Sequence, residues 1–281
     1  MYPENPIFER MTMKTYKTLL TGFFSLAIAA GNTLAATIDT ASTPEEKGLA
    51  IAIAADKNDE GWGDWSANAE MVLKNRQGQT SSREMKIQAL EQMEDGDKRL
   101  ITFDEPRDVK GTAFLVHTKK VGNDDQWLFL PALKRVKRIA SNNKSGPFVG
   151  SEFAYEDLSS QEVEKYTYKY LRDEVIDGMD CYVVERYPTD SKSGYTRQTT
   201  WIDKAEYRML KTDYYDRKDA LLKTLTATGY QEYKGQFWRA DRFFMENHQN
   251  GKSTELAWRD YKFSQDLRES SFTSARLKNA R

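Results

Sequence analysis

Alternation of apolar and polar residues, broken by turn sequences, constrains this chain more than any other feature. Between Trp65 and Leu73 apolar side chains occupy every second position, and the same alternation returns after the turn at Gln77-Gly78. A period of two places apolar side chains on one face of a β-strand, and short Gly-containing turns join such strands into antiparallel hairpins. The chain is therefore predicted to be a meander of β-hairpins.

One helix and eleven or twelve strands are predicted. The sequence Thr43-Pro44-Glu45-Glu46 has the N-cap, the first-turn proline and the capping-box glutamate of a helix start, and the helix is expected to reach about Ala55. The expected strands cover residues 65–73, 85–89, 98–104, 112–118, 126–130, 163–174, 181–187, 195–202, 207–215, 221–231, 237–247 and 254–263.

The predicted fold is mainly β. No Pro/Ser-rich linker divides the strands, so residues 36–281 are expected to form a single domain with one curled antiparallel sheet, a half-open (incomplete) β-barrel of about 11 strands. The one long irregular stretch, residues 131–160, is expected to cross the mouth of this sheet as a lid. An aromatic content of 12% suits strands and an apolar cavity better than a helical bundle.

The N-terminus resembles a secretory signal peptide. Lys14 and Lys17 precede an apolar stretch over residues 19–30, and small residues lead to a predicted cleavage site after Ala35. This stretch is about a dozen residues long, whereas a membrane-spanning helix needs roughly 20. Residues 1–35 are therefore expected to be a cleaved signal peptide, with residues 1–12 a mis-assigned start, and the mature protein is expected in the periplasm.

The composition disfavours several classes of function. A net charge of −1 gives no electrostatic case for binding nucleic acid, and one Cys with two His excludes a Cys-rich zinc fold or a multi-His metal site. Cys181 alternates with Val183 as a buried strand thiol would, and His117 ends an apolar strand. The neighbours Glu156 and Asp157 alone are weak evidence for acid–base catalysis, because acidic residues are common in this chain. We expect no catalytic residue, no metal and no cofactor.

Large apolar residues of the predicted strands are candidates for a ligand cavity, although plain core packing explains the same pattern. A slip of one residue in register would exchange the two faces of a strand. The candidates are Trp65, Met71, Met85, Ile87, Leu115, Trp127, Phe129 and Trp201.

The irregular stretch combines a basic cluster with an acidic, aromatic segment. The basic cluster surrounds Val136 and is interpreted either as a solvated sheet edge or as a patch that docks an anion or a partner. The predicted partner or lid residues are Lys134, Arg135, Lys137, Arg138, Phe153, Tyr155, Glu156 and Asp157.

Three stretches of the chain resemble the LolA-like superfamily of outer-membrane lipoprotein-sorting proteins. The middle one is the most specific, and the resemblance runs over nearly all of the predicted mature chain. The stretches are Phe103-Asp-Glu-Pro106 with Gly111 to Leu115, Trp127 to Ile139 with Gly150 to Leu158, and Tyr261-Lys-Phe263 with Phe272-Thr and Leu277.

This resemblance implies a half-open barrel with a helix inside it or across its mouth, an apolar cavity for acyl chains, and a carrier role. It also implies a subgroup that works beside resistance-nodulation-division (RND) exporters of the inner membrane. We therefore expect a monomeric periplasmic carrier of lipids or lipid-modified proteins. The alternatives are a lipid-sensing adaptor that binds a membrane partner without moving cargo, and an enzyme of unknown class.

Overall fold

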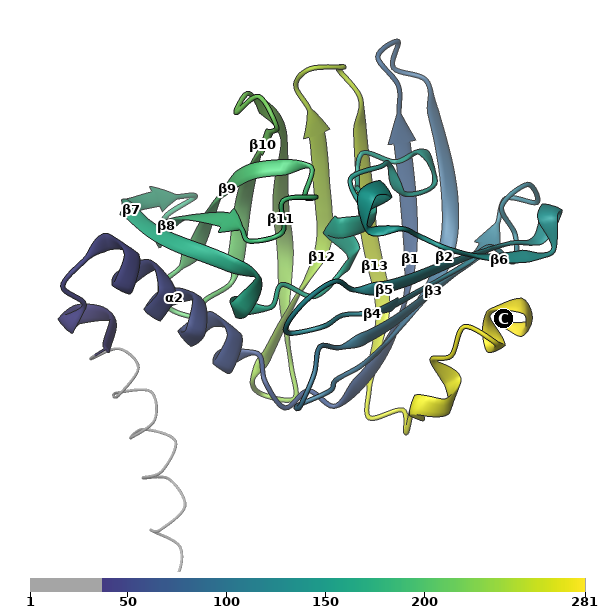
Figure 1. Cartoon of the computed structure of the whole chain (residues 1–281), viewed down its shortest axis with the longest axis horizontal. Coiled ribbons are helices and arrows are strands. Elements are labelled where there is room, and N and C mark those ends of the chain that lie inside the picture. The colour runs from purple at the N-terminus through teal and green to yellow at the C-terminus, as the bar shows by residue number, and fades with distance from the viewer. Residues whose placement is uncertain (1–36, 281) are drawn as a thin grey trace, which may run out of the picture.

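The structure, a computed structural model, describes residues 37–280, and in this range thirteen strands form one antiparallel sheet (Figure 1). The predicted signal peptide and its cleavage site lie outside the described residues. No helix within residues 37–280 is both long and apolar enough to cross a membrane. The strands are β1 (Asp64–Lys74), β2 (Thr80–Leu90), β3 (Lys98–Glu105), β4 (Ala113–His117), β5 (Asp125–Leu130), β6 (Arg135–Arg138), β7 (Tyr166–Ile176), β8 (Met179–Pro188), β9 (Tyr195–Asp203), β10 (Met209–Asp216), β11 (Leu221–Tyr233), β12 (Phe237–Asn247) and β13 (Ser253–Phe263).

The sheet consists of two meanders that meet edge to edge. Strands β1 to β6 and β7 to β13 each follow their sequence order, and the pairing of β1 with β13 joins the two sets. In this pairing Ala69 lies opposite Trp258, and Met71 lies opposite Leu256. The two outer edges of the sheet are therefore β6 and β7, which are consecutive in the sequence. The sheet is open, and the chain between β6 and β7 connects its two edges.

Helix α2 (Pro44–Asn58) begins where the sequence predicts and runs one turn farther than expected. The Thr43 hydroxyl accepts a hydrogen bond from the Glu46 amide at 3.1 Å, and the Glu46 carboxylate accepts one from the Thr43 amide at 3.2 Å. The helix packs against β7 so closely that a Cβ atom at Gly48 would lie 2.7 Å from the Tyr170 amide nitrogen. A glycine is needed at this contact, and the helix covers the strand that would otherwise be a free edge.

Two irregular segments pack on the sheet, and both contain short 3-10 turns. The first, residues 139–165, joins β6 to β7 and is called the strap; the second, residues 264–280, follows β13 and is called the tail (Figure 1). The turns are η1 (Pro131–Leu133) before β6, η2 (Ser141–Asn143), η3 (Phe148–Gly150), η4 (Tyr155–Leu158) and η5 (Val163–Lys165) in the strap, and η6 (Glu269–Ser271) and η7 (Arg276–Asn279) in the tail.

The expected fold class is confirmed, and the sheet has one strand more than the twelve ranges expected from the sequence. The additional strand is β6, in which Val136 is flanked by charged residues on both sides. It pairs with β5 through the backbone, for instance at Phe129 and Val136. A four-residue edge strand with three basic side chains has no apolar alternation, so the sequence pattern could not identify it.

Candidate functional site

A cavity of about 550 Å³ lies between the concave face of the sheet, the strap and the C-terminal half of α2. Its volume falls within the roughly 300–1,000 Å³ that is typical of small-molecule sites. Residues from both meanders line it, so the cavity exists because β1 pairs with β13. The main apolar lining residues are Trp62, Trp65, Met71, Met85, Ile87, Ile101, Tyr214, Leu225, Phe243, Leu256, Trp258 and Tyr261.

Aromatic rings pack against one another along the seam of the two meanders. The Trp65 and Tyr261 ring centroids are 5.4 Å apart, and Phe243 meets Trp258 edge-on at 4.6 Å. Such tilted and edge-on contacts each add about 0.5–1.5 kcal/mol beyond area burial and hold the rings in place. With the flexible thioethers of Met71 and Met85 beside them, the rings form an apolar wall that can adapt to chains of different shape.

The strap covers this cavity, and its aromatic side chains pack between the strap and the concave face of the sheet. Phe148, which is 1% exposed, packs against Phe114 with 5.1 Å between ring centroids and against Phe103 with 5.8 Å. Tyr155 packs on the same group, 5.4 Å from Phe114. Phe153 is also buried and lines the cavity. The predicted lid residues Phe153 and Tyr155 thus pack over the concave face together with Phe148.

A buried ion pair attaches the strap to the second meander. The Lys223 ammonium of β11 lies 2.6 Å from the Asp157 carboxylate and donates a hydrogen bond to the Glu152 carbonyl oxygen at 2.8 Å. Both charged side chains are only 4% exposed. The Tyr195 hydroxyl donates to the same Asp157 carboxylate at 2.8 Å, and burial followed by this carboxylate raises the tyrosine pKa. Removing either charge would leave the other buried without its oppositely charged partner.

Further polar contacts bind the strap at other points of the second meander. The Glu156 carboxylate accepts hydrogen bonds from the Ser193 hydroxyl and the Gly194 amide, each at 2.8 Å. Burial, and secondarily repulsion from Asp157, raises the pKa of Glu156. The Asn247 side chain donates to Glu152 at 2.7 Å. Glu156 and Asp157 are therefore anchoring groups of the strap.

Side chains of the first meander bind the backbone of the strap. Gln126 donates to the Tyr155 carbonyl oxygen at 3.0 Å, and Arg99 donates to that of Leu158 at 2.9 Å. Arg83 donates to the Val149 carbonyl oxygen. The strap is thus held by polar contacts from both meanders, with aromatic packing between them.

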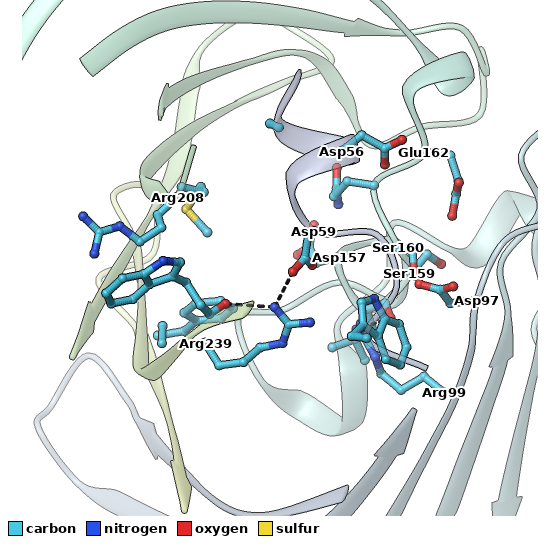
Figure 2. Close-up of a pocket in the computed structure, with 18 of the residues that line it drawn as sticks. Asp56, Asp59, Asp97, Arg99, Asp157, Ser159, Ser160, Glu162, Arg208 and Arg239 are labelled. Carbon is cyan, nitrogen blue, oxygen red and sulfur yellow. Dashed lines mark hydrogen bonds and ion pairs between the residues drawn. The ribbon is translucent and has the colours of Figure 1, made fainter. Parts of the chain in front are cut away.

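Charged side chains from α2, β3, β12, the strap and the β9–β10 turn line part of the cavity (Figure 2). Arg239 forms an ion pair with Asp59 at 2.6 Å. Arg208 forms one with Asp203 at 2.7 Å and lies 4.5 Å above the Trp238 ring. The sequence did not predict this polar part of the cavity, because its members are far apart in the chain.

The structure divides the eight predicted cavity residues into two groups of four. Trp65, Met71, Met85 and Ile87 line the cavity. The other four residues lie on the opposite face of the sheet and not in the cavity; they are Leu115, Trp127, Phe129 and Trp201.

The physical reason for this error is that β4 and β5 are apolar on both faces. Phe114 and Leu128 point to the concave core, whereas Leu115, Trp127 and Phe129 pack against the tail. Alternation cannot distinguish two buried faces. On β9, Trp201 packs with Cys181 and Val183 on the convex side, while its neighbours Thr200 and Ile202 line the cavity.

The predicted basic cluster forms the outermost strand of the first meander and the turn before it. Lys134, Arg135, Lys137 and Arg138 are all exposed, and Arg138 forms an ion pair with Asp125. None of these basic residues lines the cavity. The structure thus places this cluster at a solvated sheet edge.

The other groups considered for chemistry lie in packed surroundings. Cys181 is fully buried, and burial raises the pKa of its thiol. His117 Nε2 lies 2.7 Å from the Phe272 carbonyl oxygen, and burial lowers the pKa of the imidazole. Within residues 37–280 no group of three or more His, Cys, Asp or Glu side chains is arranged to hold a metal ion.

Comparison with known proteins identifies relatives of this chain. A family model described as an uncharacterized protein matches residues 95–279. The chain is 58% identical to a candidate outer membrane lipoprotein-sorting protein domain from Vibrio parahaemolyticus, over 83% of this chain and 99% of that chain, with a TM-score of 0.82. It is 30% identical to a DUF1329 family protein from Desulfovibrio piger, over 84% and 100% of the two chains, with a TM-score of 0.79.

A more distant structure shares the fold. A LolA superfamily protein from Nitrosomonas europaea is 22% identical over 83% of this chain and 98% of that chain, with a TM-score of 0.65. No curated protein matches the sequence.

Proposed function

Since the chain belongs to the LolA-like family of outer membrane lipoprotein-sorting proteins, we propose that it is a non-enzymatic periplasmic carrier that holds the acyl chains of a lipid or a lipid-modified protein in its cavity. The observation that carries this proposal is the apolar cavity of about 550 Å³ beneath the strap. The signal-peptide pattern of residues 1–35, with cleavage near Ala35, supports export, and residues 36–281 would act as one carrier domain.

Burial of the chain supplies the affinity in this proposal. Each buried CH₂ group contributes about 0.8 kcal/mol, so about ten of them contribute about 8 kcal/mol before ordering costs are subtracted. A gain of that size corresponds to dissociation constants in the micromolar range or weaker. Such affinity permits both loading and release, which a carrier needs.

The test is whether the purified protein contains lipid in this cavity. Native mass spectrometry of protein purified from the periplasm should show bound lipid near one equivalent. Leu256→Trp fills the cavity wall and should abolish the load, whereas the matched Leu221→Trp on an exposed position of β11 should keep it. Equal melting temperatures of the two variants exclude unfolding as the cause. Lipid-free wild type that also fails to take up added lipid would contradict the carrier role.

The basic residues of β6 and of the turn before it favour a membrane-side partner for the same carrier. We place the docking of an RND-type inner-membrane exporter, or of anionic headgroups around it, at Lys134, Arg135, Lys137 and Arg138, because they are exposed at the sheet edge away from the cavity lining. Copurification of the exporter with wild type, and its loss when these four residues are reversed to Glu, would support this partner. Bound lipid without any transfer between membranes would instead favour the lipid-sensing adaptor.

A further inference from the structure

One carboxylate at the polar part of the cavity has no partner. Glu162, at the end of the strap directly before η5, is 8% exposed and lines the cavity. Within residues 37–280 its carboxylate takes part in no hydrogen bond and no ion pair. Buried carboxylates are normally paired or hydrogen-bonded, because desolvation of an unpaired charge is costly. Glu162 is therefore available to pair with a cationic group of a ligand in the cavity.

Two more carboxylates converge on Glu162 from other elements, and the three are called the acidic end. Asp56 comes from the last turn of α2, and Asp97 comes from the turn before β3 (Figure 2). Asp97 is held in place by hydrogen bonds of 3.1 Å from the Gln92 amide and from the Ser160 hydroxyl. Burial raises the pKa of each of the three carboxylates, and repulsion from Asp97 and Asp56 raises that of Glu162 further.

The basic residues nearby attract the carboxylates of the acidic end from a distance, but none of them forms an ion pair with Glu162, Asp56 or Asp97 among the described residues. Lys165 forms an ion pair with Asp124, and Lys120 donates to the Met93 carbonyl oxygen at 3.0 Å. Arg99 donates to the strap backbone at Leu158. Among the described residues the three carboxylates do not form an arrangement suited to a metal ion. An organic ammonium group therefore matches the acidic end better than a divalent metal does.

We propose that the acidic end binds the primary ammonium group of an amphiphile whose acyl chain lies in the apolar part of the cavity. This inference rests on the proposed carrier function and names its ligand class, an aminolipid with an ethanolamine-type head. A primary ammonium has three N–H donors, which matches three converging carboxylates, and charge-assisted hydrogen bonds of this kind are about twice as strong as neutral ones. Glu162 lies at the end of the strap, so the bound head would also hold the strap in place.

The test compares two lysolipids with the same acyl chain, one with an ethanolamine head and one with a glycerol head. Titration calorimetry should show at least tenfold tighter binding of lysophosphatidylethanolamine by wild type at pH 8. Glu162→Gln should bring the two affinities together. The matched control Glu164→Gln changes an exposed neighbour outside the cavity lining and should keep the preference. The comparison of the two lysolipids on wild type tests the proposal even if a variant folds poorly.

The outcomes separate this inference from the carrier function. Equal binding of both lysolipids by wild type would overturn the ammonium site and leave the carrier role intact. Failure of both lysolipids to bind would contradict the carrier role itself. Binding of chain-free phosphoethanolamine as tightly as its lysolipid would also overturn the inference, because the site would then recognise a soluble amine.

Discussion

The strap and the tail cover opposite faces of the same strands, and they are held in different ways. The tail packs on the convex face through Phe272 and Leu277, each 1% exposed, beside Leu115 and Phe129. The strap packs on the concave face through Phe148, but its middle part is attached to the sheet by carboxylates, amides and the buried pair of Asp157 with Lys223. The apolar packing of the tail resembles that of a permanent core. The polar groups that attach the strap lie beside a cavity, and water can replace their hydrogen-bond partners when the strap opens.

This difference indicates which segment moves during loading. When the strap lifts, water can hydrate Asp157, Glu152 and Glu156. These hydrogen bonds to water offset much of the free energy lost when the hydrogen bonds to the sheet break. When the tail lifts, it exposes the apolar surface around Phe272 and Leu277, and it also breaks the His117 contact with the Phe272 carbonyl oxygen and the Lys98–Glu269 ion pair. We therefore expect the strap to open while the tail stays in place, and the following changes test that contrast.

The largest effect is expected in the tail. Phe272→Ala should lower the free energy of unfolding by about 3–5 kcal/mol, because it removes a fully buried ring from a packed cluster. Urea unfolding measures this change. The control Phe244→Ala alters a ring that is 37% exposed on β12 and should cost much less. Equal losses for the two variants would mean that the tail is not a core element.

A change in the strap is expected to lower the free energy of global unfolding less than a change in the tail, but to increase local opening of the strap clearly. Lys223→Met leaves the Asp157 carboxylate buried without its partner, which in a rigid core costs about 3–5 kcal/mol. If the strap opens locally, the lost free energy lowers the stability of the closed strap and leaves that of the sheet unchanged. Limited proteolysis should then cut within residues 139–165 at least tenfold faster than in wild type.

Two comparison variants make this experiment decisive. Lys218→Met removes an exposed lysine and should change nothing, and Lys223→Met with Asp157→Asn should recover part of the protection. Uniform loss of stability without faster cleavage of the strap would show that the strap and the sheet unfold together.

The acidic end should make the closed strap dependent on pH. In the folded protein, burial first, and then Asp97 and Asp56, raise the pKa of Glu162 from 4.5 to about 7, opposed by Lys165 and Lys120. A raised carboxyl pKa means that the folded state binds the proton more tightly, so this destabilising contribution is absent below about pH 4.5 and grows until the pH exceeds 7.

Glu162→Gln should therefore melt at a higher temperature than wild type at pH 8 and at the same temperature near pH 4. Thermal melts across this range provide the measurement, with Glu164→Gln as the control. A difference between Glu162→Gln and wild type that does not change with pH would contradict the raised pKa.

The smallest effect on stability is expected at the basic edge. Reversing Lys134, Arg135, Lys137 and Arg138 to Glu should change the free energy of unfolding by only about 0–1 kcal/mol, because all four side chains are exposed. The lipid load should also stay unchanged, while lipid transfer from vesicles with anionic headgroups should fall. Transfer at the wild-type rate would remove the docking role from β6.

The sequence pattern predicted which side chains face the cavity only in strands that have one apolar and one polar face. Along β1 and β2 the alternation placed Trp65, Met71, Met85 and Ile87 together, and the structure has them on one face lining the cavity. The alternation failed where the tail makes the second face apolar as well. The tail is far from β4 and β5 in the chain, so no local pattern at Leu115 reveals its contact.

The attachments of the strap and the acidic end could not be predicted at all. Lys223 reaches Asp157 across 66 positions of the chain. Asp56 meets Glu162 because α2 and the strap both border the cavity. Such contacts depend on how β1 pairs with β13, which single-sequence periodicity does not specify.

Hydrogen–deuterium exchange before and after lipid loading tests the central contrast most directly. Peptides from the strap should exchange faster than peptides from the tail in the lipid-free protein, and lipid should slow exchange in the strap while leaving the tail unchanged. Leu256→Trp should show no response to lipid in either segment. Lipid binding that slows exchange in the tail, or that leaves the strap unchanged, would contradict loading beneath the strap.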